Sequence, residues 1–148
     1  MTGSKKVFID TNIWIYAFLS EKSNKEKNKI ILQFLEAEIK QNLLTTSIQC
    51  INEFHNVLNR KYGVSDKEIG QYINGICEIS EIIPLNIYVY WKASDLIKKF
   101  KFSFWDSLIA SAAVLNDVDI IYSEDFQNNL KIEKNLKILN PFKNCLNI

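Results

Sequence analysis

Short apolar runs recur along this chain, and longer stretches with helical periodicity separate them. The runs lie near Val7–Ile9, Leu43–Thr45, Glu81–Ile83, Ile120–Tyr122 and Leu136–Leu139. Helical patterns fill roughly Ile13–Leu19, Lys25–Lys40, Ile48–Lys61, Asp66–Ser80, Ile87–Phe100 and Trp105–Asn116. Strands spaced by helices pair in parallel through right-handed crossovers, which bury the sheet between two helical layers. The sequence therefore predicts a three-layer α/β/α sandwich around a five-stranded, mainly parallel sheet.

We expect residues 1–148 to form one domain, because 148 residues with 47% hydrophobic content can bury a core without disulfide bonds or structural metals. No apolar run approaches the roughly 18–20 residues that a membrane span needs. The opening residues lead straight into the first strand, so we expect no signal peptide. The cysteines Cys50, Cys77 and Cys145 are odd in number and far apart. We therefore expect reduced core thiols in a cytoplasmic protein.

Four acidic residues occupy matching places at strand ends and on helix flanks. Asp10 follows the first strand directly, and Asp125 follows the fourth strand by three residues. Residues 45–47 end the second strand and begin the helix that carries Glu53, while Asp106 opens the least polar helix. Ligands of parallel α/β sheets bind outside the carboxyl ends of the strands, so we expect these acids at one edge. Buried carboxylates are costly unless a positive charge neutralises them, which predicts a divalent cation.

Each acid also has a purely structural explanation. Asp10 suits the N-cap of the helix that follows it, and Ser103 with Asp106 forms a capping-box pattern. Glu53 borders the apolar face of its helix and is equally compatible with a solvated position. Asp125 can be an exposed loop acid, and its competitors for the site are Glu124, Asp119 and Asp117. No single acid therefore establishes the site, and the prediction depends on the ordered set.

Three polar residues stand beside the acids in supporting places. Thr11 and Asn12 follow Asp10 and can orient its carboxylate and a metal-bound water. Ser123 precedes Asp125 by two residues and can donate a hydrogen bond to a carboxylate or to such a water. The single histidine, His55, lies about 200° around the helix from Glu53. It therefore cannot share a site with Glu53, and we expect it at the surface or in packing.

The lysines and arginine form clusters that the net charge of +1 conceals. Setting the four acids aside leaves 18 basic and 13 acidic residues, a remainder of +5. The clusters are Lys22, Lys25, Lys27 and Lys29, then Arg60 and Lys61, then Lys98, Lys99 and Lys101. Two interpretations stay open: solvated helix faces, or an electropositive rim that attracts a polyanion toward the acids.

The ordered set resembles the PIN-domain ribonucleases and, among them, the VapC-like toxins of type II toxin–antitoxin pairs. The matching pieces are residues 8–12, Ser47 through Phe54, residues 106–112 and residues 123–126, so the resemblance spans nearly the whole chain. It implies a parallel five-stranded sheet and an acidic Mg²⁺ or Mn²⁺ site that cleaves single-stranded RNA. Asp10, Glu53 and Asp106 take the core places of the motif, and Asp125 takes the more variable fourth. The resemblance also implies an antitoxin partner and a homodimer.

Two other functional classes stay open at this stage. A PIN module that binds or processes RNA without acting as a toxin would share these motifs. The tripeptide Asp10-Thr11-Asn12 also resembles the start of Asp-based phosphatases and receiver-like domains, in which the aspartate is phosphorylated. Those phosphatases have a second aspartate two residues after the first, where this chain has Asn12. That departure disfavours the phosphatase.

Overall fold

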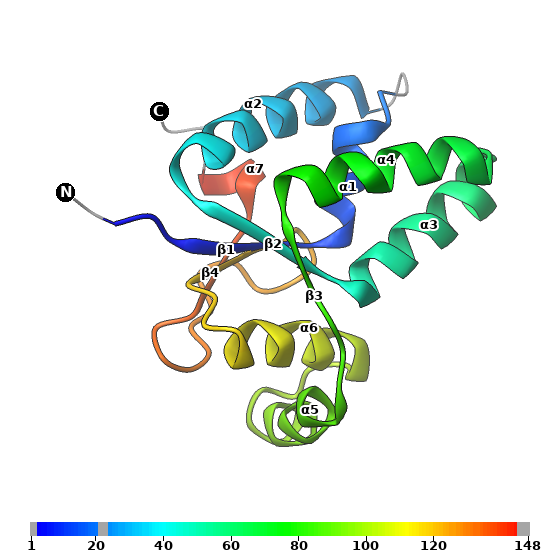
Figure 1. The fold of residues 1–148 in the computed structure, drawn as a ribbon. Helices are drawn as coiled ribbons and strands as arrows, with labels where there is room; N and C mark the ends of the chain where they lie inside the picture. The colour runs from blue at the N-terminus through cyan, green and yellow to red at the C-terminus, as the bar shows by residue number, and fades with distance from the viewer. Residues whose placement is uncertain (1–2, 21–23, 145–148) are drawn as a thin grey trace.

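A five-stranded parallel sheet forms the centre of the computed structural model, which describes residues 3–20 and 24–144 (Figure 1). Its strands are β1 (Lys6–Ile9), β2 (Leu43–Ser47), β3 (Glu81–Ile83), β4 (Ile120–Tyr122) and β5 (Lys137–Leu139). They lie in the order β3-β2-β1-β4-β5, and every neighbouring pair is parallel. β1 is central, with Val7 opposite Leu44 on one side and Ile120 on the other. The predicted sheet is confirmed.

Two helical layers cover the sheet, as Figure 1 shows. One layer contains α1 (Thr11–Phe18), α2 (Lys25–Gln41), α3 (Ile48–Tyr62) and α4 (Asp66–Ile79), with the short α7 (Pro141–Asn144) beside α2. The other contains α5 (Ile87–Phe100) and α6 (Phe104–Leu115), which pack against each other. This is the predicted α/β/α sandwich. Among the described residues, no helix combines the length and the apolarity that crossing a membrane requires.

The central strand shows why both faces need a helical layer. Val7 and Ile9 are fully buried in the core beneath α1 to α4, whereas Phe8 is fully buried in the core beneath α5 and α6. Successive side chains of a strand point to opposite faces, so an apolar strand of this kind must be covered twice. The polar residues that follow β1 are then held at the carboxyl edge of the sheet.

Three features differ from the sequence prediction. Helix α1 begins at Thr11 rather than Ile13, because Asp10 caps it with its side chain. The four-residue α7 was not predicted, since so short a helix carries no periodic pattern. Cys50 is buried, but Cys77 is exposed on α4, so the prediction of a core thiol is wrong there. Cys145 lies outside the described residues.

Candidate active site

One pocket at the carboxyl edge of the sheet is lined by all four predicted acids. Its volume is about 200 Å³. The acids come from four places in the fold: the end of β1, helix α3, the first turn of α6 and the loop after β4. The lining residues are Asp10, Thr11, Asn12, Glu53, Asn56, Val57, Trp105, Asp106, Ile109 and Asp125. Residues separated by more than 100 positions thus meet because parallel strands end at one edge.

Asp10 lies deepest, with 4% of its surface exposed. Its Oδ1 accepts a hydrogen bond from the backbone N–H of Thr11 at 2.7 Å, and its Oδ2 accepts one from the Ser123 hydroxyl at 2.6 Å. The thiol of Cys50 lies 3.7 Å from Oδ1. Burial raises the pKa of Asp10 from 3.8 to about 6, against the effect of both hydrogen bonds, and the charges of Asp125 and Glu53 raise it further. The two hydrogen bonds therefore offset only part of the cost of ionising this buried carboxylate.

Glu53 is half-buried on α3, the helix that Ser47 caps. The Thr11 hydroxyl donates to its Oε2 at 3.0 Å, and the Gln49 amide donates to its Oε1 at 3.1 Å. Both oxygens therefore have neutral donors, which fix the orientation of the carboxylate without cancelling its charge.

Asp106 and Asp125 complete the acidic cluster. Ser103 caps α6 by accepting from the backbone N–H of Asp106 at 3.1 Å, so the capping role that was considered for this pair is present. Burial raises the pKa of Asp106, and the charge of Glu53 adds to the effect. Burial also raises the pKa of Asp125, followed by the charges of Glu124, Asp106 and Glu53. Structural capping and a place in the pocket thus coexist at Asp106.

Two of the three alternatives to Asp125, Glu124 and Asp119, bind partners outside the pocket. Glu124 accepts hydrogen bonds from Lys27 and from the Tyr16 hydroxyl, each at 2.8 Å. Asp119 accepts from the backbone N–H of Lys6 at 2.9 Å. Of the acids in this part of the chain, only Asp125 lines the pocket described above.

The three supporting residues, Thr11, Asn12 and Ser123, each donate to one of the acids through their side chains. The Thr11 hydroxyl binds Glu53 and not Asp10, which receives only the Thr11 backbone N–H. The Asn12 amide donates to Asp125 at 2.7 Å. Ser123 links two acids, because its hydroxyl donates to Asp10 while accepting the Asp125 backbone N–H at 3.1 Å. Thr11 thus orients Asp10 through its backbone N–H, whereas the side chains of Thr11 and Asn12 orient Glu53 and Asp125. Their role toward a metal-bound water stays a prediction.

Two residues lie at the site that the sequence prediction did not assign to it. Gln49 is buried one turn before Glu53, and its amide bridges Glu53 and the backbone carbonyl of Trp105, the latter at 3.3 Å. Cys50 lies behind Asp10, and burial raises the pKa of its thiol to about 12, with the Asp10 charge adding to the rise. A glutamine within a helix carries no pattern, so only its position four residues before Glu53 hinted at the contact.

The chemistry of the pocket suits a hard divalent cation. Its four charged groups are all carboxylates, the ligands that Mg²⁺ and Mn²⁺ prefer over thiols and imidazoles. None of the ion pairs that the described residues form involves these four acids. Within residues 3–20 and 24–144, however, no three acids, histidines or cysteines are close enough together to form a finished metal site. The donor set fits a cation, and the side chains would have to draw together around it.

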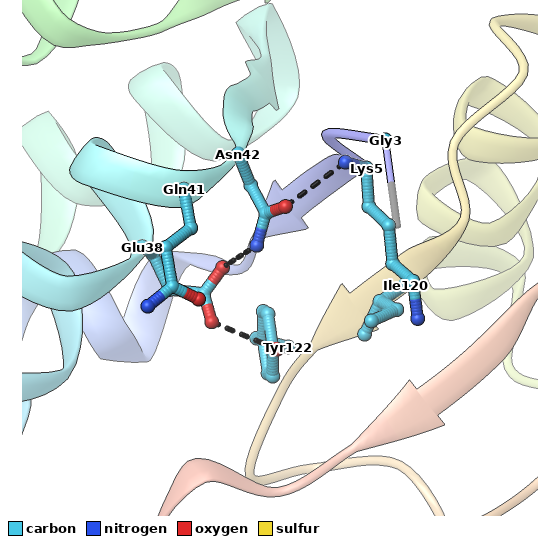
Figure 2. A pocket seen from close by; sticks show the side chains of 7 residues that line it. All are labelled: Gly3, Lys5, Glu38, Gln41, Asn42, Ile120 and Tyr122. Atoms are coloured by element: carbon cyan, nitrogen blue, oxygen red, sulfur yellow. Dashed lines mark hydrogen bonds between the residues drawn. The ribbon is translucent and has the colours of Figure 1, made fainter. Parts of the chain in front are cut away.

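A second, larger pocket of about 490 Å³ opens at the amino edge of the sheet (Figure 2). Its acid, Glu38, accepts a hydrogen bond from the Tyr122 hydroxyl at 3.0 Å and one from the Asn42 amide at 2.6 Å. Both carboxylate oxygens of Glu38 thus point at protein donors, as Figure 2 shows. This pocket offers no cluster of like charges and is a poorer candidate despite its size.

None of the described members of the basic clusters lines the acidic pocket, and neither does His55. Lys27 pairs with Glu124 at 2.8 Å, and Lys99 pairs with Glu133 at 3.2 Å. The remaining described members are exposed, and Lys22 lies outside the described residues. His55 contacts Asp66 at 2.9 Å, so it takes the surface position that was expected. These contacts favour solvated faces for Lys27 and Lys99 over an electropositive rim.

Comparisons with known proteins agree with this geometry. The family model described as PIN domain matches residues 7–130. No curated protein matches the chain. The VapC20 toxin of Mycobacterium tuberculosis, described as cleaving the sarcin–ricin loop, aligns at a TM-score of 0.66 and 15% identity, over 80% of this chain and 89% of its own.

Two toxin–antitoxin complexes align equally well. The Rickettsia felis VapBC2 structure, bound to a DNA fragment from its promoter, has a TM-score of 0.66 and 19% identity over 91% of this chain and 98% of its own. A toxin–antitoxin complex from Klebsiella pneumoniae has a TM-score of 0.66 and 20% identity, with 91% and 97% covered. At these identities the structures establish the fold. Because the family model spans well over half of the 148 residues, the chain belongs to the PIN-domain family.

Proposed function

We propose that this protein is a metal-dependent endoribonuclease that hydrolyses phosphodiester bonds of single-stranded RNA. The observation that carries the proposal is the pocket of four carboxylates, Asp10, Glu53, Asp106 and Asp125, at the carboxyl edge of the sheet. Three of them have a raised pKa, and the described residues supply no cationic partner to any of them. Such a cluster stores repulsion that a bound divalent cation would relieve.

The four acids would hold Mg²⁺ or Mn²⁺, and a bound ion of this kind makes its water more acidic and stabilises charge on phosphoryl oxygens. The protein contributes orientation. Ser123 holds Asp10, Thr11 and Gln49 hold Glu53, and Asn12 holds Asp125. Each supporting donor is neutral, so it directs a carboxylate while leaving its full charge for the cation. Attack of water on phosphorus with departure of the 3′ oxygen would leave a 5′-phosphate and a 3′-hydroxyl.

The biological role that we propose is the toxin of a toxin–antitoxin pair. This rests on membership of the PIN family and on the structural likeness to VapC toxins, some of them in complex with their antitoxins. The partner would be an antitoxin protein whose peptide covers the acidic pocket, and a homodimer would present two such pockets. This role assigns the chain to the cytoplasm, where its RNA substrate would be found.

A PIN module that binds or processes RNA without being a toxin is the main alternative. The presence of all four acids argues against a module that has lost cleavage, because none of the ion pairs among the described residues neutralises them. The Asp-based phosphatase gains no support, since the position that would supply its second acid is Asn12, whose amide is committed to Asp125.

A cleavage assay on an end-labelled single-stranded RNA tests the nuclease. The purified chain should cleave in Mg²⁺ or Mn²⁺ and stop in EDTA. Asp10→Asn should slow cleavage by more than about 100-fold, because removing a direct ligand costs more than disturbing its outer hydrogen bonds. The matched control is Asp66→Asn, which alters an exposed aspartate outside the pocket and should cleave like the parent. Equal rates for Asp10→Asn and the parent would refute the mechanism.

Growth on induction tests the toxin role separately. Expression of the parent chain should arrest growth, and expression of Asp10→Asn should not. Normal growth in cells that contain cleavage-active protein would remove the toxin role and leave the nuclease intact.

A further inference from the structure

An exposed tryptophan forms part of the wall of the acidic pocket. Trp105 lies in the first turn of α6, next to Asp106, and 61% of its surface is open to solvent. It lines the same pocket as the four acids, together with the apolar Val57 and Ile109. Large aromatic side chains are normally buried for the area that they remove from water. An indole left open beside a charged pocket is therefore a feature to explain.

Hydrogen bonds of the Gln49 side chain fix the backbone position of Trp105. The Gln49 amide donates to the Trp105 carbonyl at 3.3 Å and to Glu53 at 3.1 Å. Gln49 is only 5% exposed, so this link between α3 and α6 is shielded from water. On the other side, the Phe104 ring lies 5.3 Å from the indole at 68°, an edge-to-face contact. The buried Gln49 side chain thus fixes the backbone of Trp105 next to Glu53, and the Phe104 ring contacts the indole.

The pocket is too small to enclose a whole nucleotide. Its volume is about 200 Å³. Sites that enclose small molecules typically measure about 300–1,000 Å³. If a phosphate and part of its sugar occupy the acidic pocket, the base must lie outside it, and Trp105 is the exposed aromatic residue among those that line the pocket.

We propose that Trp105 is the stacking surface for an unpaired nucleobase that flanks the phosphate in the acidic pocket. The inference rests on the proposed nuclease and adds a specificity-determining residue to it. Every base has a π-face, so stacking is tolerant of sequence, but a base inside a duplex has both faces covered. Trp105 therefore selects unpaired segments without selecting one base.

A second tryptophan provides the matched control. Trp91 on α5 is also 61% exposed, and it contacts Tyr90, whose ring in turn contacts Phe104. Trp91 does not line the acidic pocket. If the exposed rings form a docking face for a second copy of the chain, Trp91 and Trp105 would contribute alike. If Trp105 stacks a base, only Trp105 matters for RNA.

The experiment measures binding of a fluorescent single-stranded RNA oligonucleotide to the full chain carrying Asp10→Asn, which prevents cleavage during the titration. In that background, Trp105→Ala should raise Kd roughly 5- to 100-fold. Trp105→Phe should recover most of the affinity, and Trp91→Ala should bind like its parent. An oligonucleotide of abasic residues should bind the parent as weakly as the ordinary RNA binds Trp105→Ala, and Trp105→Ala should not distinguish the two.

Three results would overturn the inference. They are unchanged affinity in Trp105→Ala, equal losses in Trp105→Ala and Trp91→Ala, and a loss in Trp105→Ala that accompanies a change in the mass of the assembly. The last two would assign the face to a second copy. A cleavage assay on the chain with the natural Asp10 distinguishes failure of this inference from failure of the proposed nuclease. If that chain cleaves RNA and any of the three results is found, only the stacking role of Trp105 is refuted. If that chain cleaves no RNA, the proposed function itself is refuted.

Discussion

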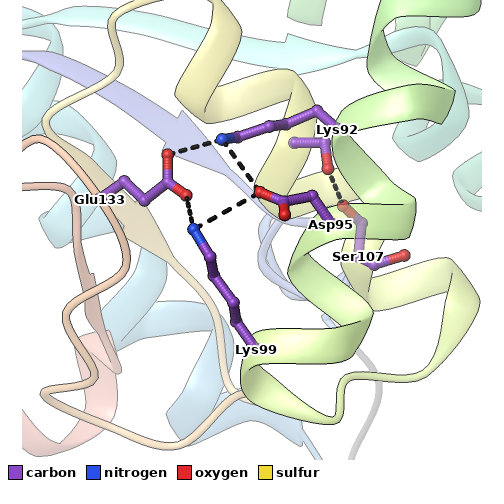
Figure 3. A network of polar contacts seen from close by, with 6 residues as sticks. Lys92, Asp95, Lys99, Ser107 and Glu133 are labelled. Carbon is purple, nitrogen blue, oxygen red and sulfur yellow. Dashed lines mark hydrogen bonds and ion pairs between the residues drawn. The ribbon is translucent and has the colours of Figure 1, made fainter.

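Two clusters of carboxylates in this protein differ in one respect: only one of them contains cations. In the network of Figure 3, Glu133 pairs with Lys92 at 2.7 Å and with Lys99 at 3.2 Å. Asp95 lies 3.5 Å from each lysine. These hydrogen bonds and charges lower the pKa of Glu133, chiefly through Lys92. In the acidic pocket, burial and neighbouring carboxylates raise the pKa of Asp10, Asp106 and Asp125.

The presence or absence of neighbouring lysines separates acids that stabilise the fold from acids that are suited to bind a cation. The paired acids of the network link α5 to the loop before β5, and their own lysines neutralise them. Three of the four pocket acids, Glu53, Asp125 and Asp10, accept from neutral donors, so they are oriented but remain charged. A carboxylate that the fold orients without neutralising weakens the fold and is suited to bind a cation. Removing one charge from each cluster should therefore change stability in opposite directions.

Asp10→Asn should give the largest change in stability. At pH 7 without metal, the free energy of unfolding should rise by up to about 3 kcal/mol, because the pKa of Asp10 rises from 3.8 to about 6 on folding. Between these values the folded state binds more protons than the unfolded state, so the parent loses stability as pH rises. The gain over the parent should be complete above pH 6 and absent below pH 3.8. Urea unfolding in EDTA across this range measures it.

Asp66→Asn is the control for that series. Asp66 is exposed in the first turn of α4, where a negative charge favours the helix. Its replacement should bring no gain at pH 7. A parent that is as stable as Asp10→Asn in metal-free buffer would show that the pocket stores no repulsion.

Addition of Mn²⁺ or Mg²⁺ should give the second-largest change. A ligand that binds only the folded state raises the free energy of unfolding by about 2.7 kcal/mol at a concentration 100 times its Kd. The thermal midpoint of the parent should therefore rise with metal and return with EDTA, and Asp10→Asn should respond much less. Equal responses in parent and variant would place any metal binding outside the pocket. The readout is independent of cleavage.

The same contrast shows what sequence could predict. The short apolar runs and the acids after them were sufficient for the sheet, the sandwich and the common edge, because parallel strands must end together. The choice of Asp125 over Glu124 depends on where Lys27 and Tyr16 place their donors, which no local pattern encodes. That the Thr11 hydroxyl faces Glu53 depends likewise on the packing of α1 against α3.

Gln49 and Cys77 show the limits of patterns on helices. From the sequence alone, Gln49 cannot be distinguished from a surface glutamine. Its burial depends on two partners, Glu53 and Trp105, that lie on different helices. Cysteine is usually buried, and this general preference misplaced Cys77, which lies on the exposed side of α4. Both errors arise because burial is a property of tertiary contacts and not of residue type.

Ser123→Ala should give an intermediate change that sharpens the role of Asp10. The hydroxyl donates to a buried ionised carboxylate and accepts the Asp125 N–H, so its loss should destabilise the fold by about 1–3 kcal/mol at pH 8. That hydrogen bond lowers the pKa of Asp10, so removing it should raise the pKa above about 6. The loss should shrink at pH 5, where Asp10 is largely protonated. A loss independent of pH would indicate that Ser123 acts only through packing.

Glu133→Gln should give the smallest change in the free energy of unfolding. Whether this change is a loss or a gain tests the contrast between the lysine-paired acids and the pocket acids. Glu133 is half-buried and accepts from two lysines, so its replacement should cost at most about 1 kcal/mol at pH 7, and less as salt rises. Its pKa is lowered from 4.5, so the stability that it contributes is present above 4.5 and lost as pH falls below that value. Urea unfolding at pH 7 and pH 3.5 measures the loss. A gain at pH 7, like that of Asp10→Asn, would mean that partly or fully buried carboxylates destabilise this fold whether or not a lysine faces them.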